Sequence, residues 1–458
     1  MKSYDLKPTF ENLFDTYNKN VIGRNADIFR FTEILDSIED GCSIALDGNW
    51  GSGKTFFVKQ VKMVMDAHNR FINNNGNNMI NEIVDIRKKY YCDRKIELQS
   101  QVCVYYDAWE NDDDEDPVMS LVYAIMNSVA TDFDFKDTNF IKMGASIIQF
   151  FSGINLTELF EDLKRTSPLD GLKERKGMKA KISEFLDSLI PKKGNRLIVF
   201  IDELDRCKPS YAVRLLERIK HYFSHDNITF VFSVNINELQ NTIRKYYGDN
   251  FNGTRYLDRF FDLKVTLPPP DLKGYYSSLN FDDSYYTYNN VCASVIESFH
   301  LELREIAKFI RLTKIAYDIP TQDNSYSFFL PDDRVLKFCL VYIIPIIIGL
   351  KIVDIKRYTD FIEGRDYTPL VEIANAQKLI MFDKLLDQDE TYNEQKTDLM
   401  VVTLEDKLKA MYDAIFVTTY SEEVYTVRIG KLHFTADVKD TLLRTAGLFS
   451  KYTTLDTD

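Results

Sequence analysis

Basic residues are in short supply in this chain. It has 57 Lys and Arg against 70 Asp and Glu, which gives a formal net charge of −13. Proteins that bind nucleic acid non-specifically carry excess positive charge, which displaces the counterions of the phosphates. The charge balance therefore disfavours nucleic acid as a direct general ligand, although it leaves room for a local basic groove.

Paired cysteines are missing as well. The six cysteines are scattered without a C-x-x-C pair, and the five histidines show no metal-ligand spacing. Isolated thiols of this kind are typical of reduced, buried cysteines. A chain of 458 residues can bury a large core without a disulfide or a structural metal. We therefore expect a cytoplasmic protein of two or three domains.

Long hydrophobic runs are also absent. The first five residues have no apolar core, so they do not resemble a signal peptide. A membrane-spanning helix needs roughly 20 apolar residues. The segment from Phe140 to Leu156 is interrupted by polar residues, and the uncharged segment from Phe338 to Leu350 is too short. We expect both to be buried helices and predict no stable membrane insertion.

Short apolar runs alternate with helical patterns along the first part of the chain. They predict buried strands at residues 42–47, 102–106, 197–201, 228–234 and 263–267. This alternation predicts an α/β fold, a parallel sheet flanked by helices. Three consecutive prolines, 268–270, mark a boundary. We predict a core over residues 1–270 with a helical insertion at 110–190, a helical lid over 271–330, and a mostly helical C-terminal domain over 331–458 that ends in a hairpin around Gly430.

A glycine-rich turn follows the first predicted strand. The turn reads Gly48-Asn49-Trp50-Gly51-Ser52-Gly53-Lys54-Thr55 and matches the Walker A pattern G-x-x-x-x-G-K-[ST]. Its glycines let backbone N–H groups surround phosphate oxygens, and the helix that continues through Phe56 adds the positive end of its dipole. Lys54 would reach the β- and γ-phosphates, and the Thr55 hydroxyl would ligate Mg²⁺. The core is therefore predicted to be a P-loop NTPase.

A second motif, of the Walker B type, ends the strand at residues 197–201 with two carboxylates. Asp202 would hold Mg²⁺ through water, and Glu203 is placed to polarise the attacking water as a general base. The second acid favours hydrolysis over phosphate transfer to a metabolite. The N-K-x-D guanine reader of Ras-type GTPases is missing, so ATP is the expected nucleotide.

Three further polar residues are candidates for the site. Asn235 ends the strand at 228–234, where it could contact the γ-phosphate or serve as a helix cap. Arg259, before the last strand, and Arg304, beyond the prolines, could each place a guanidinium on the transition-state phosphate, or form a surface ion pair. An arginine near the position of Arg259 reaches a neighbour's nucleotide in related ring- and dimer-forming proteins. We therefore expect a homo-oligomer promoted by ATP, with Arg304 as the competing candidate in cis.

Four elements resemble the KAP family of P-loop NTPases, a branch of the ASCE/STAND-like class. They are the tryptophan within the phosphate loop, Tyr106-Asp107-Ala108-Trp109, the Asp-Glu-Leu-Asp-Arg-Cys-Lys-Pro run at residues 202–209, and Leu215-Leu216-Glu217-Arg218-Ile219-Lys220. The third element is the most specific, and the resemblance covers roughly residues 10–315. This chain has Glu203 and Asn235 where the family often has Asp, and it lacks the paired membrane helices of many members.

The resemblance implies one strand between the phosphate-loop strand and the Asp-Glu strand, and a helical lid after Pro270. It also implies that Gly23 and Arg24 form the turn on the adenine side. Soluble bacterial members suggest a molecular switch in anti-phage defence, acting with protein partners from the same operon. Two other functions are weighed against it: an ATP-binding scaffold with little hydrolysis, and a nucleic-acid motor or nuclease subunit. The intact motifs argue against the first. The acidic charge argues against the second, and the tyrosine-rich loop at 275–288 lacks the basic residues it would need.

Overall fold

The computed structural model describes residues 7–72, 78–92, 97–133, 136–152, 168–272, 275, 286–322, 333–376, 403–421, 424–429 and 432–447. The described chain divides into two compact units. One lies within residues 6–278, and the other takes up the described residues from 286 onward. Each unit is considered by itself below.

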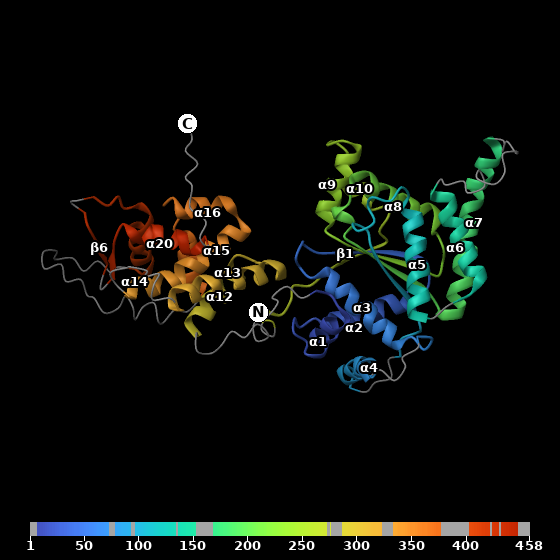
Figure 1. Ribbon diagram of the computed structural model, residues 1–458, viewed down its shortest axis with the longest axis horizontal. Helices are drawn as coiled ribbons and strands as arrows, with labels where there is room; N and C mark the ends of the chain where they lie inside the picture. Colours follow the sequence, from blue (N-terminus) through green and yellow to red (C-terminus); the bar gives the residue numbers. More distant parts are fainter. Residues whose placement is uncertain are drawn as a thin grey trace. The chain divides into compact units, whose positions relative to one another are not determined.

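The first unit is built on a five-stranded sheet (Figure 1). Its strands are β1 (Cys42–Asp47), β2 (Val102–Asp107), β3 (Leu197–Asp202), β4 (Ile228–Val234) and β5 (Leu263–Thr266). They lie in the order β2-β3-β4-β1-β5, and every neighbouring pair is parallel. The predicted α/β class and parallel sheet are therefore confirmed. One strand, β4, separates β1 from β3, as the family resemblance implied.

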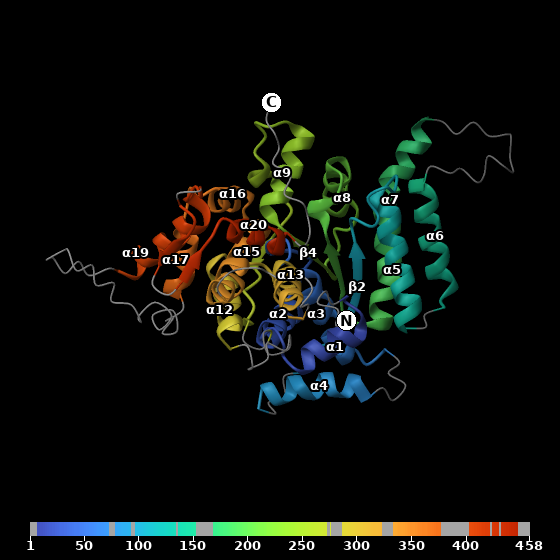
Figure 2. The same ribbon diagram turned by 60° about the vertical axis from the view of Figure 1, so that its left-hand side comes forward.

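Helices cover both faces of this sheet (Figure 2). The core on one face is shared with residues of α1 (Phe10–Asn18), α2 (Asn25–Ser37), α3 (Lys54–His68) and α4 (Asn78–Tyr90). The core on the other face is shared with residues of α5 (Pro117–Phe133), α6 (Thr138–Ser152), α7 (Pro168–Lys193), α8 (Pro209–Tyr222), α9 (Ile236–Tyr247) and α10 (Gly253–Leu257). Neighbouring strand residues serve opposite faces: Cys103 belongs to the first core and Val104 to the second. This explains the continuous apolar runs, because a strand buried on both faces has no polar side.

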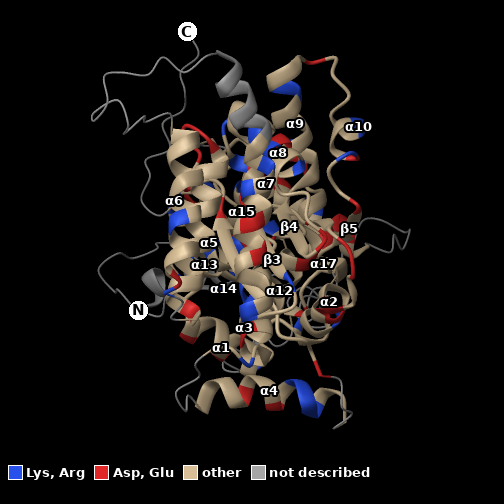
Figure 3. Ribbon diagram, turned by 90° about the vertical axis from the view of Figure 1, so that its right-hand side faces the viewer, with Lys and Arg blue, Asp and Glu red and all other residues tan. Residues whose placement is uncertain are grey.

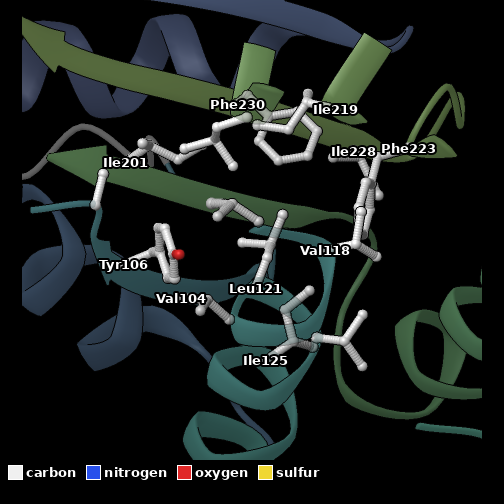
Figure 4. Close-up of a cluster of buried hydrophobic side chains, with 14 of the residues drawn as sticks. Val104, Tyr106, Val118, Leu121, Ile125, Ile201, Ile219, Phe223, Ile228 and Phe230 are labelled. Carbon is white, nitrogen blue, oxygen red and sulfur yellow. The ribbon is translucent and has the colours of Figure 1, made fainter. Parts of the chain in front are cut away.

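Figure 4 shows part of the second core. Side chains of β2, β3 and β4 meet those of α5 and α8, and Val104, Leu121 and Ile201 are fully buried. Burying one such side chain contributes about 1.5–3 kcal/mol. The polar atom of Tyr106 is satisfied inside this core, because its hydroxyl lies 2.5 Å from that of Tyr211.

The helical insertion expected at residues 110–190 contains α5, α6 and α7. Asp116 caps α5, since its carboxylate accepts a hydrogen bond from the Val118 N–H at 2.9 Å. The expectation of a buried helix from Phe140 to Leu156 was wrong for the part in α6, and residues 153–156 lie outside the described residues. Only Phe140, Gly144 and Ile147 are buried in α6, and Ile141 is 45% exposed. The apolar run is wider than the single stripe that α6 can bury against α5 and α7.

Lys and Arg are interspersed with Asp and Glu along the helices in Figure 3. In α4, for example, acidic residues Glu82 and Asp85 precede a basic last turn that includes Lys88 and Lys89. Among the residues that the structure describes, no helix combines the length and the apolar content needed to cross a bilayer.

The second unit is mostly helical, as predicted for the C-terminal region. It contains α12 (Tyr286–Ser298), α13 (Leu303–Gln322), α14 (Asp333–Phe338), the π-helix η4 (Cys339–Ile343), α15 (Ile344–Val353), α16 (Ile355–Ile362), α17 (Thr368–Ala376), α19 (Leu404–Tyr412), the π-helix η5 (Asp413–Val417) and α20 (Asp437–Ala446). The apolar segment from Phe338 to Leu350 is buried except for half-buried Val341, in agreement with the expectation.

Two short strands complete the second unit, β6 (Val427–Ile429) and β7 (Leu432–Phe434), which pair antiparallel as the predicted hairpin requires. Gly430 lies outside the described residues, as does most of the tyrosine-rich loop at 275–288. Helices α12 and α13 pack on α15 within this unit. The finer division into a lid over 271–330 and a domain over 331–458 stays a prediction.

Candidate nucleotide-binding site

The glycine-rich loop leaves β1 at its carboxyl end and leads directly into α3. Gly51 and Gly53 have φ angles of +85° and +89°, a region that residues with a side chain rarely adopt. The loop is closed by hydrogen bonds from the Gly48 N–H to the Val234 carbonyl (3.1 Å) and from the Ser52 N–H to the Asn49 carbonyl (3.2 Å). The glycines at these positions are therefore required by the backbone, and α3 presents its amino end at the loop.

Lys54 and Thr55 are the first two residues of α3, and their side chains are the ones predicted to bind phosphate and Mg²⁺. Lys54 is 9% exposed, and its ammonium donates to the carbonyls of Gly48 (2.6 Å) and Asn49 (3.0 Å). Burial lowers the pKa of Lys54, while the nearby carboxylates of Asp205, Asp202 and Glu203 act in the opposite direction. The ammonium is thus held inside the loop that would surround a phosphate.

The Thr55 hydroxyl donates to Asp202 Oδ2 at 2.7 Å, across from the loop. The same oxygen accepts a hydrogen bond from the Tyr105 hydroxyl at 3.0 Å, and Asp202 is only 1% exposed. A threonine at the loop and an aspartate at the end of β3 are the pair that holds Mg²⁺ in P-loop NTPases. The buried Ser52 Oγ has no hydrogen-bond partner among the described residues, so the loop also offers a free polar atom. These residues fit a magnesium–nucleotide complex.

Glu203 follows Asp202 in a left-handed backbone conformation, with φ +61°. Its carboxylate Oε2 lies 2.5 Å from Arg206 Nε. Burial raises the pKa of Glu203 to about 7. The Arg206 charge opposes this rise, and the carboxylates of Asp202, Asp205 and Asp107 add to it. An acid with a raised pKa in a strained turn beside a phosphate site has the properties of a general base.

Four carboxylates gather at this end of the sheet. Asp107 lies opposite Asp202 in the register of β2 and β3, and Asp205 follows in the one-turn helix η2 (Leu204–Arg206). Burial raises the pKa of Asp107 and of Asp205 more than any other influence. A concentration of acids around a single loop makes the local potential negative and favours positive charge there.

Both tryptophans of the chain lie at this cluster. Trp50 is 47% exposed, and its indole N–H donates to Asp205 Oδ2 at 2.6 Å. Trp109 is 53% exposed, and its ring lies 5.4 Å from the Arg206 guanidinium. The sequence motifs contained these residues, but their partners, Asp205 and Arg206, were not among the predicted site residues. Their position in the most specific family element was the signal that could have identified them.

The predicted turn at Gly23 and Arg24 packs against the phosphate loop. Arg24 is 2% exposed and donates to the carbonyls of Ser52 (2.8 Å) and Pro268 (2.7 Å). Gly23 has φ +66°, and a Cβ there would lie 2.5 Å from the Cβ of Asp271. Arg24 thus ties the loop to the segment after β5. Contact of this turn with an adenine stays a prediction.

Asn235 caps a helix, which is the alternative to the predicted phosphate contact. Its side-chain oxygen caps α9 by accepting from the N–H groups of Asn237 (3.1 Å) and Glu238 (3.3 Å). Asp47 supports the same turn, since its carboxylate accepts from the Ile236 N–H at 2.9 Å. Asn235 therefore lies at the carboxyl end of the strands, as expected, with its oxygen engaged in capping.

The structure places the candidate Arg259 away from this constellation. Arg259 is exposed and lines a cavity of about 330 Å³ with Cys42, Ser43 and Ile228, at the amino ends of β1 and β4. That is the opposite end of the strands from Gly48. Arg304 belongs to the other unit, at the start of α13.

Comparison with known proteins supports a nucleotide-binding module in this chain. The family model described as the KAP family P-loop domain matches residues 24–318, which is more than half of the chain. None of the curated proteins matches the chain significantly. Among solved structures, the ORC2 protein of Aeropyrum pernix (ADPNP-ADP complexes) is similar at 12% identity, over 74% of this chain and 79% of that chain, with a TM-score of 0.31. A score this low adds nothing to the fold described above.

Proposed function

The chain belongs to the KAP family of P-loop domains, and on that premise we propose that it is a Mg²⁺-dependent ATPase that acts as a molecular switch. Membership of this family establishes that the chain contains a nucleotide-binding module. The observation that carries the finer proposal is the Thr55–Asp202 hydrogen bond of 2.7 Å, with Glu203 adjacent in sequence. A loop that only bound nucleotide as a scaffold would not need a second acid in a strained conformation.

Each residue of the site has a separate task in this proposal. The N–H groups of the loop and the Lys54 ammonium bind the phosphates. Thr55 and Asp202 hold Mg²⁺, which neutralises phosphate charge when bound. Glu203 orients a water molecule for in-line attack and takes its proton. Asp205 fixes Trp50 of the loop, and Arg24 fixes the loop backbone.

The test is hydrolysis of ATP and GTP by the purified full chain. Lys54→Ala should abolish nucleotide binding, whereas Glu203→Gln should keep binding and lose turnover, because the amide retains the shape but cannot accept the proton. Lys19→Ala, an exposed lysine after α1, is the matched control and should behave as the unaltered chain. Normal turnover in both site variants would end the proposal, and a preference for GTP would refute its choice of base.

The biological setting of the switch is proposed from the family resemblance. We infer a cytoplasmic role in bacterial defence against phage, with proteins from the same operon as partners. All six cysteines are free thiols, which supports a reducing compartment. A plaque assay compares the intact operon with one that carries Lys54→Ala. Equal protection by both would remove ATP binding from the mechanism.

Self-association is the remaining part of the proposal. Arg259 is exposed at the amino end of its own sheet, so it could serve only the site of a neighbouring copy. An arginine supplied in trans can be worth about 10³-fold in rate. An Arg259→Ala subunit should then be rescued by a Glu203→Gln subunit. Absence of rescue, with activity per subunit independent of concentration, would leave Arg304 in cis as the candidate.

A further inference from the structure

The ion pair between Glu203 and Arg206 has a consequence for the reaction. Arg206 Nε lies 2.5 Å from Glu203 Oε2, and the two side chains are only 16% and 22% exposed. Both belong to one tight turn, since Glu203 precedes the one-turn helix η2 that ends at Arg206. The guanidinium charge at this distance lowers the proton affinity of the carboxylate and restrains its orientation. The general base is thus engaged by a neighbour three residues away.

We propose that Arg206 is a positioning residue that holds the Glu203 carboxylate away from the attacking water, so that the ion pair must open before each hydrolysis step. This inference rests on the proposed ATPase activity and adds a control to it. The cost of opening the pair would slow the basal rate, and any condition that moved Arg206 would increase it.

Trp109 determines where Arg206 can lie. Its ring faces the guanidinium at 5.4 Å, within the range of a cation–π contact. The loop that carries Trp109 is fixed to the sheet: the Trp109 N–H donates to Asp107 Oδ1 at 3.1 Å, and the Ala108 N–H donates to the Asp202 carbonyl at 2.9 Å. The tryptophan therefore holds the arginine from the exposed side, while Glu203 holds it from the buried side.

The surrounding carboxylates favour an ion pair at Glu203. Asp202, Asp205 and Asp107 all repel a charged Glu203, and Arg206 is the cation that opposes them most directly. The Arg206 charge also acts on Lys54 inside the loop. Opening the ion pair would therefore also change the electrostatic potential at Lys54.

The experiment measures kcat, and the affinity for a fluorescent ATP analogue, in variants of the full chain. Arg206→Gln should raise basal kcat about tenfold, which corresponds to about 1.4 kcal/mol, with affinity within about twofold of the unaltered chain. Trp109→Ala should raise kcat about threefold, whereas Trp109→Phe should have little effect because it keeps a ring. Arg214→Gln, an arginine of α8 that donates to the Glu115 carbonyl, is the control and should change neither value.

The double variant Glu203→Gln with Arg206→Gln separates the two proposals. It should be as inactive as Glu203→Gln alone, because the gain depends on the base. A fall in kcat on Arg206→Gln, with affinity retained and with partial rescue by Arg206→Lys, would overturn the inference and make Arg206 a cation for the phosphate. Normal turnover by Glu203→Gln would instead refute the proposed function. Thermal melts of each variant identify any loss of folding. If Arg206→Gln does not fold, a higher kcat for Trp109→Ala than for Trp109→Phe still supports the inference, and equal values contradict it.

Discussion

The parallel sheet carries charged side chains at both ends of its strands, but they are held in opposite ways. At the carboxyl ends, Asp202, Glu203 and Asp205 crowd together with few cations, and Glu203 has a left-handed backbone. At the amino ends, the buried Arg196 donates to the backbone carbonyls of Glu39, Asp40 and Asp226. The carboxyl ends of the strands thus bring several negative side chains together. At the amino ends, neutral backbone carbonyls accept hydrogen bonds from one positive side chain.

This difference indicates what each end does. Carboxylates that repel one another cost stability, and such an arrangement is retained where a cation or a reaction requires it. A buried arginine that donates hydrogen bonds to three carbonyls instead links several chain segments through its planar guanidinium. We therefore expect substitutions at the carboxyl end to change activity more than stability, and substitutions at the amino end to do the reverse.

Asp202→Asn should have the largest effect and would test the carboxyl end. We expect kcat to fall about 10³-fold, because a metal-holding charge is removed. The melting temperature without nucleotide and Mg²⁺ should stay the same or rise, because one of the repelling carboxylates becomes neutral. Asp262→Asn is the matched control at the amino end, where Asp262 Oδ2 accepts from the Ser43 N–H at 2.8 Å. A large drop in melting temperature for Asp202→Asn would contradict the comparison.

Arg196→Met tests the amino end. The free energy of unfolding should decrease by about 3 kcal/mol, because buried carbonyls lose their charged donor. Urea unfolding followed by circular dichroism measures this change, and kcat per folded molecule should stay unchanged. Arg255→Met, at an exposed arginine of α10, should alter neither quantity. Loss of activity without loss of stability would show that the two ends are coupled.

Arg24→Met refines the comparison, because Arg24 is a buried arginine located at the carboxyl end. Removing its bonds to the Ser52 and Pro268 carbonyls should loosen the phosphate loop and raise the Kd for ATP about tenfold, a change of about 1.4 kcal/mol. Titration calorimetry measures the Kd. Arg30→Met, on the exposed side of α2, is the control. An unchanged Kd would mean that the loop keeps its shape without this tie.

Asn235 should give the smallest effect. Asn235→Ala should cost about 1 kcal/mol of stability by removing the cap of α9, whereas Asn235→Ser should cost little because serine also caps helices. Thermal melts distinguish the two variants, and kcat should be equal in both. A fall in kcat for the serine variant, at unchanged stability, would assign the amide to the phosphate or the attacking water.

Much of the first unit could be predicted from the sequence. The strand at 42–47 was predicted with its observed bounds, and so was the strand at 228–234. The continuous apolar run of a buried strand is local information, and so is the glycine pattern of the loop. The exposure of α6 was not predicted, because the apolar content of a helix does not reveal how many neighbours will cover it. Ile141, 45% exposed, is the residue that shows this difference.

The sequence by itself determined the strands, the phosphate loop and the identity of the acids that follow β3. Only the tertiary structure decided which of these groups meet. The Thr55–Asp202 bond joins residues 147 positions apart, and the Arg24–Pro268 bond joins residues 244 positions apart. The same structure carried Arg259 to the opposite end of the sheet and brought Arg206 and Trp109 to Glu203. The physical reason is that strand order and helix packing set distances between side chains, and neither is encoded in the local pattern around a residue.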